Sequence, residues 1–460
     1  MTHEHTDILI CGAGIAGIST AYHLTVNHGL KDVLIVDERH PLTLTSDKST
    51  ECYRNWWPGP GDGMVRLMNR SIDIMESLAQ ESDNFFHLTQ RGYLYVTADP
   101  ARVDVFRKAG EEAEALGAGP LRCHEGNARD PRYRPARPRG WAGGIDGSDL
   151  ILDSSLIREH FPYLTEKAVA VLHARRCGWL SAQQLGMYML ERAKDRGARY
   201  MQGRITGIHV KGGRVEGVEM ERRGSGRFIG TDVFVNAAGP FVARVAGMMG
   251  IRLPVFSELH AKVAFNDHRG VLPREAPLII WTDAQTIPWT SEERDLVAES
   301  EEGRRLLGVF PPGAHMRPEG GPGSASMIML WAYDTPPVEP VFPPDFDSDY
   351  PEVALRGLSR MVPDLEAYFG KIPRPFVDGG YYTKTRENRP LIQPLPVSGA
   401  YVIGALSGFG IMASCAAGEL LSACITRSPL PSYAPCFTLE RYRDPAYVSL
   451  LDAWDESGQL

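Results

Sequence analysis

The first 37 residues contain the feature that most narrows the possible folds of this chain, a glycine-rich turn between two expected strands. Residues 7–11 form a short apolar run, and residues 33–36 form another that ends at Asp37. Both runs are typical of buried parallel strands. Between them, residues 11–17 read CGAGIAG and match the pattern G-x-G-x-x-G, and the small apolar residues up to position 25 predict a helix. A strand, a glycine turn, a helix and a strand within about 30 residues predict one βαβ unit.

Each glycine of this turn has a physical reason to be a glycine. Gly12 permits a tight turn off the strand, Gly14 lets a pyrophosphate approach the backbone, and Gly17 lets the helix pack closely on the sheet. The helix N-terminus then presents free N–H groups and the positive end of its dipole to phosphates. Asp37, 20 residues after Gly17, is placed to accept both ribose hydroxyls and to repel a 2′-phosphate. The unit therefore predicts an adenine dinucleotide, FAD or NAD rather than NADP.

The rest of the chain contains segments typical of a nucleotide-binding domain and a middle region typical of an antiparallel sheet. Apolar residues recur at helical spacing over residues 64–79 and 183–196, and the second stretch closes at Gly197. Residues 205–220 predict a hairpin around the sequence KGGR. Residues 254–341 alternate strand-like runs with loops rich in Pro and Gly, which indicates an antiparallel sheet inserted between parts of the nucleotide domain. Further strands are expected at residues 232–237, 278–281, 327–331 and 401–404.

Composition and charge exclude several classes of protein. The formal net charge is −8 and the pI is about 5.9, unlike the basic footprint of a nucleic-acid binder. The most basic stretch, residues 129–139, is interrupted by prolines and is interpreted as a solvated loop. Seven scattered cysteines without close Cys/His spacing favour a reducing compartment over disulfides or a metal site.

The N-terminus lacks the pattern of a signal peptide, so we expect a cytoplasmic protein. Residues 401–418 carry no charge and approach the length of a membrane span. They hold four glycines and are followed by Glu419, which favours a buried strand, a turn and a helix. We therefore expect no membrane span, no metal and no nucleic-acid partner.

Three further stretches make the chain resemble the D-amino-acid oxidase superfamily, on the branch that holds sarcosine oxidase, dimethylglycine dehydrogenase and glycine oxidase. Residues 37–61 resemble the family's polar loop beneath the flavin, and residues 180–239 resemble its helix, hairpin and strand ending in Ala-Ala-Gly. Residues 380–419 resemble the second glycine turn, which in the family places N–H groups at the flavin pyrimidine ring, where negative charge forms on reduction. The stretches occur in the family's order and extend over nearly the whole chain.

The resemblance implies an α/β fold in which a Rossmann-like FAD-binding domain with a parallel sheet is interleaved with a substrate-binding domain built on a mainly antiparallel sheet. The implied FAD-binding domain is discontinuous and comprises residues 1–90, 145–250 and 375–435. The implied substrate-binding domain comprises residues 91–144 and 251–374, and a C-terminal tail comprises residues 436–460. The implied cofactor-binding residues are Gly12, Gly14, Ile15, Ala16, Gly17, Asp37, Glu38, Arg39, Ser46, Lys48, Ser49, Thr50, Ile205, Ala238, Gly239, Gly408, Gly410, Ile411 and Met412.

The chain departs from the family's pattern at several positions. Gly380 stands where monomeric sarcosine oxidases carry a flavin-linking cysteine, and Cys52 where dimethylglycine dehydrogenases carry a flavin-linking histidine. We therefore predict non-covalent FAD. Tyr382 replaces the carboxylate-binding arginine of glycine oxidases, and Met412 replaces a carboxylate-binding lysine of sarcosine oxidases. Residues 327–333 lack the lysine that helps sarcosine oxidases use oxygen, so the electron acceptor stays open between oxygen and an electron-transfer protein.

The implied activity is oxidation of the C–N bond of a small secondary or tertiary amine, such as an N-alkyl amino acid, by hydride transfer to flavin N5. Arg54 matches an arginine that grips the substrate carboxylate in the sarcosine oxidase branch, and a guanidinium suits this because its planar fork pairs with a carboxylate. A surface arginine is the alternative interpretation. Tyr382 is the second candidate for positioning the substrate. Trp56 and Trp57 are either an aromatic wall for an alkylated amine or core.

Three other functions remain open. A 2-hydroxy-acid dehydrogenase on the same fold needs a histidine base, for which His260 is the candidate. A flavin hydroxylase is disfavoured because no late Gly-Asp pair occurs in residues 403–419. A flavoprotein subunit without turnover is the non-enzymatic alternative. The Pro/Gly-rich residues 311–325 are interpreted as a surface loop, with an active-site lid as the alternative.

Overall fold

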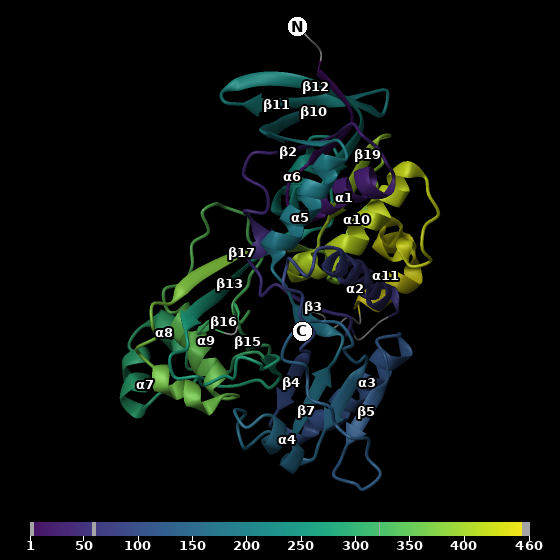
Figure 1. The fold of residues 1–460 in the computed structure, drawn as a ribbon. Helices are drawn as coiled ribbons and strands as arrows, with labels where there is room; N and C mark the ends of the chain where they lie inside the picture. The colour runs from purple at the N-terminus through teal and green to yellow at the C-terminus, as the bar shows by residue number, and fades with distance from the viewer. Residues whose placement is uncertain (1–3, 58–60, 322, 453–460) are drawn as a thin grey trace.

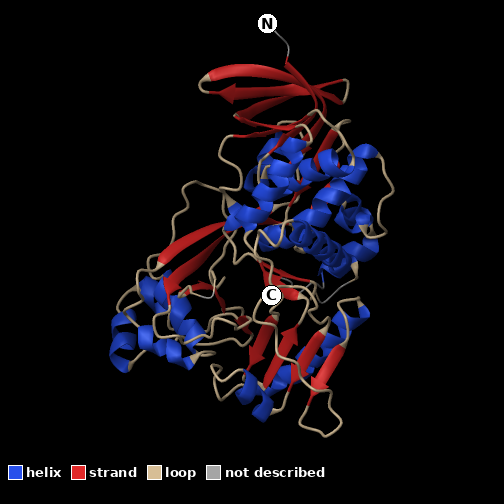
Figure 2. Cartoon of the chain, viewed as in Figure 1, coloured by secondary structure: helices blue, strands red, loops and turns tan. Residues whose placement is uncertain are grey.

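Two large sheets organise the chain in the computed structural model, which describes residues 4–57, 61–321 and 323–452 (Figures 1 and 2). The first sheet has eight strands, and its parallel centre runs in the order β12, β1, β2, β9, with β19 beside β12. An antiparallel hairpin extends one edge, and one further strand pairs with β19. The strands are β1 (Glu4–Cys11), β2 (Val33–Asp37), β9 (Ala198–Gln202), β10 (Arg204–Lys211), β11 (Arg214–Arg222), β12 (Ser225–Asn236), β18 (Leu391–Pro394) and β19 (Ala400–Gly404).

Helices pack against the first sheet and build the upper part of the molecule in Figure 1. They are α1 (Ile15–Tyr22), which continues as a π-helical turn at His23–Asn27, α2 (Gly63–Glu81), α5 (Ala182–Asp195), α6 (Val242–Gly247) and α10 (Gly410–Thr426). Helix α10 approaches α1 closely, since a side chain at Gly418 would place its Cβ 2.3 Å from the Ser19 hydroxyl oxygen. The Ser19 hydroxyl also donates to the Ser414 carbonyl.

The uncharged stretch considered as a membrane span is therefore β19 followed by the core helix α10. By length and composition alone, residues 407–426 could cross a membrane, but 67% of the apolar window lies buried inside the fold. The glycines and serines that weaken an isolated helix here allow close packing against α1. This burial is typical of a core helix.

The second sheet has nine strands and is mainly antiparallel, with two parallel pairs, β4 with β14 and β5 with β6. In spatial order its strands are β17 (Phe376–Lys384), β13 (Phe256–Asn266), β16 (Ser326–Leu330), β15 (His315–Pro318), β14 (Leu278–Trp281), β4 (Tyr93–Thr97), β7 (Ala170–Ala174), β6 (Ser148–Ile151) and β5 (Leu121–His124). Its helices are α3 (Val103–Ala115), α4 (Ser154–His160), α7 (Ser291–Val297), α8 (Glu301–Arg305) and α9 (Tyr350–Ser359). A two-stranded ribbon, β3 (Cys52–Arg54) with β8 (Cys177–Trp179), completes the strands.

The predicted fold class is confirmed: a parallel sheet with the βαβ unit at its centre is interleaved along the chain with a mainly antiparallel sheet. The sheet pairing differs from the predicted domain division within residues 145–250. Strands β6 and β7 lie there, yet they pair with the second sheet. Apolar strand patterns do not specify which sheet a strand joins, because the partner strand lies far away in the sequence.

Residues 311–325, which the sequence predicts to be a surface loop, include a buried strand. Residues 315–318 form β15, a fully buried strand of the second sheet, and residue 322 lies outside the described residues. Pro and Gly on both sides hide this four-residue strand from pattern reasoning. By contrast, Arg134 and Arg137 of the basic stretch 129–139 are exposed, as a solvated loop requires.

The described part of residues 436–460, predicted as a tail, packs on the chain as short helical segments: η7 (Ala434–Phe437), η8 (Leu439–Arg443) and α11 (Pro445–Asp452). Residues 453–460 lie outside the described residues. Arg441 is buried and pairs with the buried carboxylate of Glu387, with 2.8 Å between Arg441 Nε and Glu387 Oε1. Tyr442 and Tyr447 donate to the same oxygen. This segment is therefore anchored by a buried ion pair.

We expect Arg441→Met to lower the free energy of unfolding by about 3 kcal/mol or more, because it leaves the Glu387 carboxylate buried without its cation. The matched control is Arg443→Met, which removes the exposed pair with Glu440 two residues later and is expected to have little effect. Urea unfolding at pH 7 measures both variants. Equal small losses would contradict the role assigned to the buried pair.

Candidate functional site

The carboxyl ends of four parallel strands meet at one edge of the first sheet. β1 is followed by the glycine turn, β2 ends at Asp37, and β12 and β19 run into residues 237–240 and 404–410. Two cavities follow this edge and share six lining residues, Gly14, Thr45, Ser46, Ala237, Gly239 and Pro240. We call the two together the trough. Open α/β sheets bind their ligands at such an edge.

The glycine turn leaves no room for side chains where the strands and the helix meet. Gly12 has a φ of +117°, and a Cβ there would lie 2.2 Å from the carbonyl oxygen of Ala237. A Cβ at Gly17 would lie 2.0 Å from the carbonyl oxygen of Gly12. Gly14 instead faces the trough, beside Ser46, whose hydroxyl oxygen accepts from the backbone N–H of Ile15. The first turn of α1 is therefore held open at the cavity wall, as phosphate binding by this motif requires.

Asp37 lines the first cavity with a carboxylate that is held in place. Its Oδ2 accepts from the N–H of Ala13 at 2.7 Å, and its Oδ1 accepts from the N–H of Arg39 at 2.9 Å. Burial raises the pKa of Asp37, while these two N–H donors lower it. The carboxylate is thus oriented by the backbone of the glycine turn, in the position from which it could accept ribose hydroxyls.

The second cavity lies against the N-terminus of α10. Gly410 and Ile411 line it, and the preceding residue Phe409 provides no side-chain cap. Ala405 and Ser407 have positive φ values of 53° and 45°, a strained conformation that tends to occur at functional sites. The buried hydroxyl of Ser407 has no hydrogen-bond partner among the described residues. Uncapped N–H groups, a helix dipole and this hydroxyl fit a flavin ring, which gains negative charge on reduction.

Most residues predicted to hold FAD line the trough. They are Gly12, Gly14, Ile15, Ala16, Asp37, Glu38, Ser46, Ser49, Ile205, Ala238, Gly239, Gly408, Gly410 and Ile411. The others, Gly17, Arg39, Lys48, Thr50 and Met412, line neither cavity, and Lys48 forms an ion pair with Asp378. Sequence reasoning missed residues that line the trough only through folding, among them Thr45, Gly203, Phe241, Arg244 and Thr383. Their types and spacing carry no dinucleotide signal.

Arg54 is buried, 5% exposed, which rules out the surface interpretation. Its Nη1 donates to the hydroxyl of Tyr95 at 2.9 Å, and its guanidinium lies 4.8 Å from the ring centre of Trp57. Trp57 in turn meets the ring of Phe409 edge-on at 5.2 Å. Because Phe409 lies between Gly408 and Gly410, this chain of contacts connects Arg54 to the second cavity.

The two tryptophans are both buried, but their surroundings differ. Trp56 is 5% exposed and packs near Tyr95, with ring centres 6.2 Å apart. Trp57 has the guanidinium of Arg389 at 5.9 Å in addition to that of Arg54. Trp56 therefore has the environment of a core residue, whereas Trp57 lies between two buried cations.

Tyr382 lines the second cavity from β17 and stacks on His260 of the neighbouring strand β13. The ring centres are 4.1 Å apart with an interplanar angle of 16°. His260 Nε2 and Lys384 Nζ both contact Oε2 of Glu258, at 3.0 and 2.7 Å. Burial lowers the pKa of His260, although its hydrogen bond with Glu258 works in the opposite direction. His260 thus stacks on Tyr382 and belongs to a polar network with Glu258 and Lys384.

Strand pairing also brings a lysine that sequence reasoning missed next to Ser49, a residue that lines the trough. Lys262 lies on β13 opposite Leu330, and its Nζ donates to the carbonyl oxygen of Ser49 at 2.9 Å. Only the pairing of distant strands could have indicated this residue.

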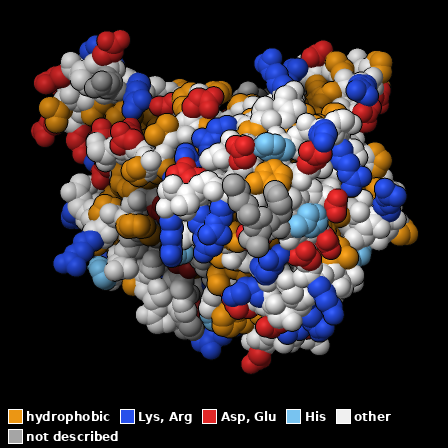
Figure 3. Space-filling view, turned by 90° about the horizontal axis from the view of Figure 1, so that it is seen from above, with side chains coloured by type: hydrophobic (Ala, Val, Ile, Leu, Met, Phe, Trp, Pro, Cys, Tyr) orange, Lys and Arg blue, Asp and Glu red, His pale blue; other side chains and the backbone are white. Residues whose placement is uncertain are grey.

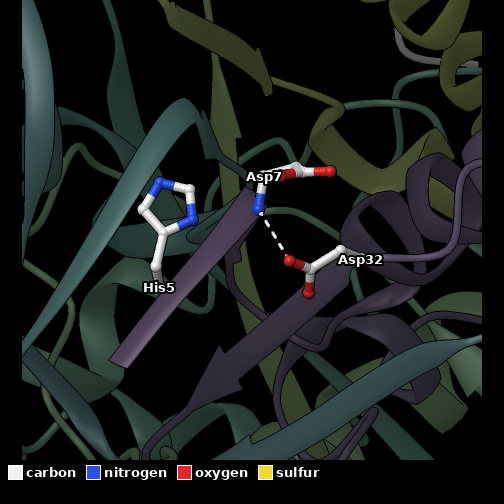
Figure 4. Close-up of side chains that lie close together, drawn as sticks. All are labelled: His5, Asp7 and Asp32. Atoms are coloured by element: carbon white, nitrogen blue, oxygen red, sulfur yellow. Dashed lines mark hydrogen bonds between the residues drawn. The ribbon is translucent and has the colours of Figure 1, made fainter. Parts of the chain in front are cut away.

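One group of residues could hold a metal ion by ligand type and spacing: His5, Asp7 and Asp32, whose ligand atoms lie within 4.8 Å of one another. Figure 4 shows the Asp32 carboxylate facing the backbone N–H of Asp7. The same carboxylate accepts from Thr6 and Arg199. These contacts account for the cluster as a surface polar network.

On the face seen in Figure 3, acidic and basic side chains are intermixed.

Comparisons with known proteins agree with this geometry. Residues 7–424 match the DAO family, described as FAD dependent oxidoreductase. The chain is 26% identical to sarcosine oxidase subunit beta of Rhizobium meliloti over 57% of this chain and 55% of the relative, and 24% identical to mitochondrial dimethylglycine dehydrogenase of Homo sapiens over 91% and 42%. It therefore spans about half the length of the curated relatives it matches.

Two solved structures share the fold at low sequence identity. L-proline dehydrogenase from P. horikoshii superposes with a TM-score of 0.72 at 18% identity, covering 96% of this chain and 98% of that one. Glycine oxidase from Geobacillus kaustophilus superposes with a TM-score of 0.70 at 16% identity, covering 95% and 98%. These likenesses establish the fold over nearly the full length of the chain.

We expect Gly12→Ala to weaken FAD binding by about tenfold or more, because the new Cβ must displace the Ala237 carbonyl in the cavity wall at a cost of about 1–3 kcal/mol. The control is Gly226→Ala, where a Cβ meets nothing within 4 Å. Titration of the apoprotein with FAD, followed by flavin fluorescence, measures both affinities. Equal affinity of the two variants would contradict the assignment of the glycine turn.

Proposed function

Because the chain belongs to the DAO family of FAD-dependent oxidoreductases, we propose that it oxidises the C–N bond of a small secondary or tertiary amine, such as an N-alkyl amino acid. Bound FAD supplies the two-electron acceptor, which takes a hydride from the carbon next to nitrogen. The amine lone pair becomes the second bond of a C=N group, and water then releases the carbonyl product. The names of the two curated relatives, a sarcosine oxidase subunit and a dimethylglycine dehydrogenase, support this substrate class.

The observation that carries the proposal is the buried Arg54, which contacts Trp57 and through it Phe409, next to the second cavity, where the flavin ring is expected. A guanidinium that is buried among the aromatic side chains of Tyr95 and Trp57 can pair strongly with a carboxylate, since few waters compete for it. In this proposal Arg54 binds the substrate carboxylate and so orients the carbon–hydrogen bond toward the flavin ring. The face of Trp57 is available to an alkylated ammonium group.

Tyr382 is proposed to position the substrate from β17, on the wall of the second cavity. Its ring stands between the Gly408 backbone and His260, which restricts its rotation. The hydroxyl makes no hydrogen bond with the residues that the structure describes. We propose that the hydroxyl donates to the substrate, in the place where glycine oxidases use an arginine.

The cofactor is proposed to be held without a covalent link by the residues that line the trough. Gly380 offers no nucleophile, and Cys52 is buried with its Sγ turned to the carbonyl oxygen of Thr50. The electron acceptor is proposed to be oxygen or an electron-transfer protein. Lys262, beside Ser49, provides a cation that could stabilise charge on oxygen as it is reduced.

The geometry argues against the 2-hydroxy-acid alternative. A base for a hydroxyl proton must present a free ring nitrogen to the substrate. His260 lines neither cavity of the trough, and the ring of Tyr382, which does line the second cavity, covers one face of its ring.

The substrate class is tested by anaerobic bleaching of the flavin. We expect sarcosine, dimethylglycine or proline to remove the FAD absorbance, and D-amino acids, lactate, malate and 2-hydroxyglutarate to have no effect. Readmission of oxygen then separates an oxidase, which regains its absorbance at once, from a dehydrogenase, which regains it slowly. Failure of every amine to bleach the flavin would sink the proposed substrate class.

The role of Arg54 is tested with Arg54→Lys, which keeps the charge and loses the planar fork. We expect kcat/KM for the carboxylated amine to fall by about tenfold to a hundredfold, equivalent to roughly 1.4–2.7 kcal/mol. An analogue with the carboxylate replaced by a methyl group serves as the internal control and should lose little. A proportionate loss on both substrates, with FAD content unchanged, would mean that Arg54 does not bind the carboxylate.

A further inference from the structure

Another cavity lies next to strands β4 and β7 of the second sheet. Figure 1 shows these two strands in the lower part of the molecule. Its volume is about 220 Å³, and it shares no lining residue with the trough. Arg91 precedes β4, Arg175 follows β7, and Arg134 and Arg137 belong to the loop between β5 and β6. Every charged side chain in the lining is one of these four arginines. We call this space the arginine cavity.

His173 and Arg175 form the buried inner wall of the arginine cavity, 0% and 5% exposed. Nδ1 of His173 accepts from the hydroxyl of Tyr133 at 2.9 Å and from Nη1 of Arg175 at 2.6 Å. Its Nε2 donates to the carbonyl oxygen of Arg91. Burial lowers the pKa of His173 well below its ordinary value, so the ring is neutral at pH 7. His173 therefore holds the Arg175 guanidinium in place without adding charge.

Carboxylates do not balance the arginines of this cavity. Arg175 faces one acid, Asp149, with 3.5 Å between Nε and Oδ2. Asp149 is already shared with Arg122, which donates to both of its oxygens at 2.8 and 3.0 Å. Arg91, Arg134 and Arg137 form no ion pair with any carboxylate whose side chain the structure describes. The cavity therefore has an excess of positive charge that an anion would neutralise.

Two contacts fix the Arg91 side chain, and one of its nitrogens has no hydrogen-bond acceptor within the described part of the chain. Its guanidinium lies 4.8 Å from the ring centre of Trp179, and its Nη1 donates to the carbonyl oxygen of Arg274. Its buried Nε has no hydrogen-bond partner among the described residues. Burial lowers the pKa of Arg91 to about 10; Glu275 raises it, and the charge of Arg274 lowers it. A bound anion would supply the negative charge that the Arg91 guanidinium lacks.

We propose that the arginine cavity binds a small anion that carries carboxylate or phosphate groups. Arg175 and Arg91 offer guanidinium groups at the inner wall, whereas the exposed Arg134 and Arg137 offer them at the mouth. A ligand with an anionic group at each end can contact the arginines of the inner wall and those of the mouth together. Guanidinium forks pair with carboxylate and phosphate alike. This site is independent of the amine-oxidising function proposed for the trough.

The test uses the FAD-loaded protein and isothermal titration calorimetry with citrate, with inorganic phosphate and with chloride at constant ionic strength. We expect citrate or phosphate to bind saturably, one per chain, and chloride not to bind. The double variant Arg134→Ala/Arg137→Ala should weaken that binding about tenfold or more. The matched control Arg129→Ala/Arg132→Ala removes two exposed arginines of the same loop that do not line the cavity and should bind as the wild type.

Because all four substituted arginines are exposed, both double variants should unfold at the wild-type temperature, and their melting curves verify this. Binding of citrate alone, or of phosphate alone, supports the site and identifies the anionic group that it prefers. Absence of saturable binding by both anions would overturn the proposal. An equal loss of affinity in the two double variants would also overturn it, because that result indicates general attraction to a basic loop.

Discussion

The close contact between Gly12 and the carbonyl of Ala237 is the constraint on which the site depends. It brings the ends of β1 and β12 so near that only a glycine fits, and it lets α1 start directly at the sheet edge. Asp37 is oriented by the same turn, through the N–H of Ala13. A dinucleotide can lie along this edge only because the strands end together and the backbone remains accessible.

Electrostatics divides the trough into two functional ends. At the first cavity, the start of α1 and the Asp37 carboxylate suit a pyrophosphate and a ribose. At the second, the uncapped start of α10 suits a ring that becomes negative when reduced. The second sheet contributes Tyr382 to this end, with His260 stacked on Tyr382 and Lys262 bonded to Ser49. A guanidinium among buried aromatic rings attracts a carboxylate strongly because little water screens the charges, which is the physical reason to place a carboxylate beside Arg54.

Sequence reasoning succeeded where signals are local and periodic. The βαβ unit, the helix at residues 64–79 and the strand at residues 278–281 occur within a few residues of their predicted bounds. It failed at β15, because prolines and glycines surround a strand too short for a periodic pattern. Its range 145–250 for the FAD-binding domain also includes β6 and β7, which pair with the second sheet. Neither the burial of Arg54 nor the approach of Lys262 to Ser49 has a local signature.

By itself, the sequence determined that the chain folds around a dinucleotide turn and carries a second glycine turn near its end, because both are encoded by neighbouring residues. Only the tertiary structure decided which side chains surround the flavin end of the trough and which arginines gather at the separate cavity. Those groupings join segments far apart in the sequence, 122 residues for His260 with Tyr382 and 84 residues for Arg91 with Arg175. Strand pairing and close packing, rather than local preference, set such distances.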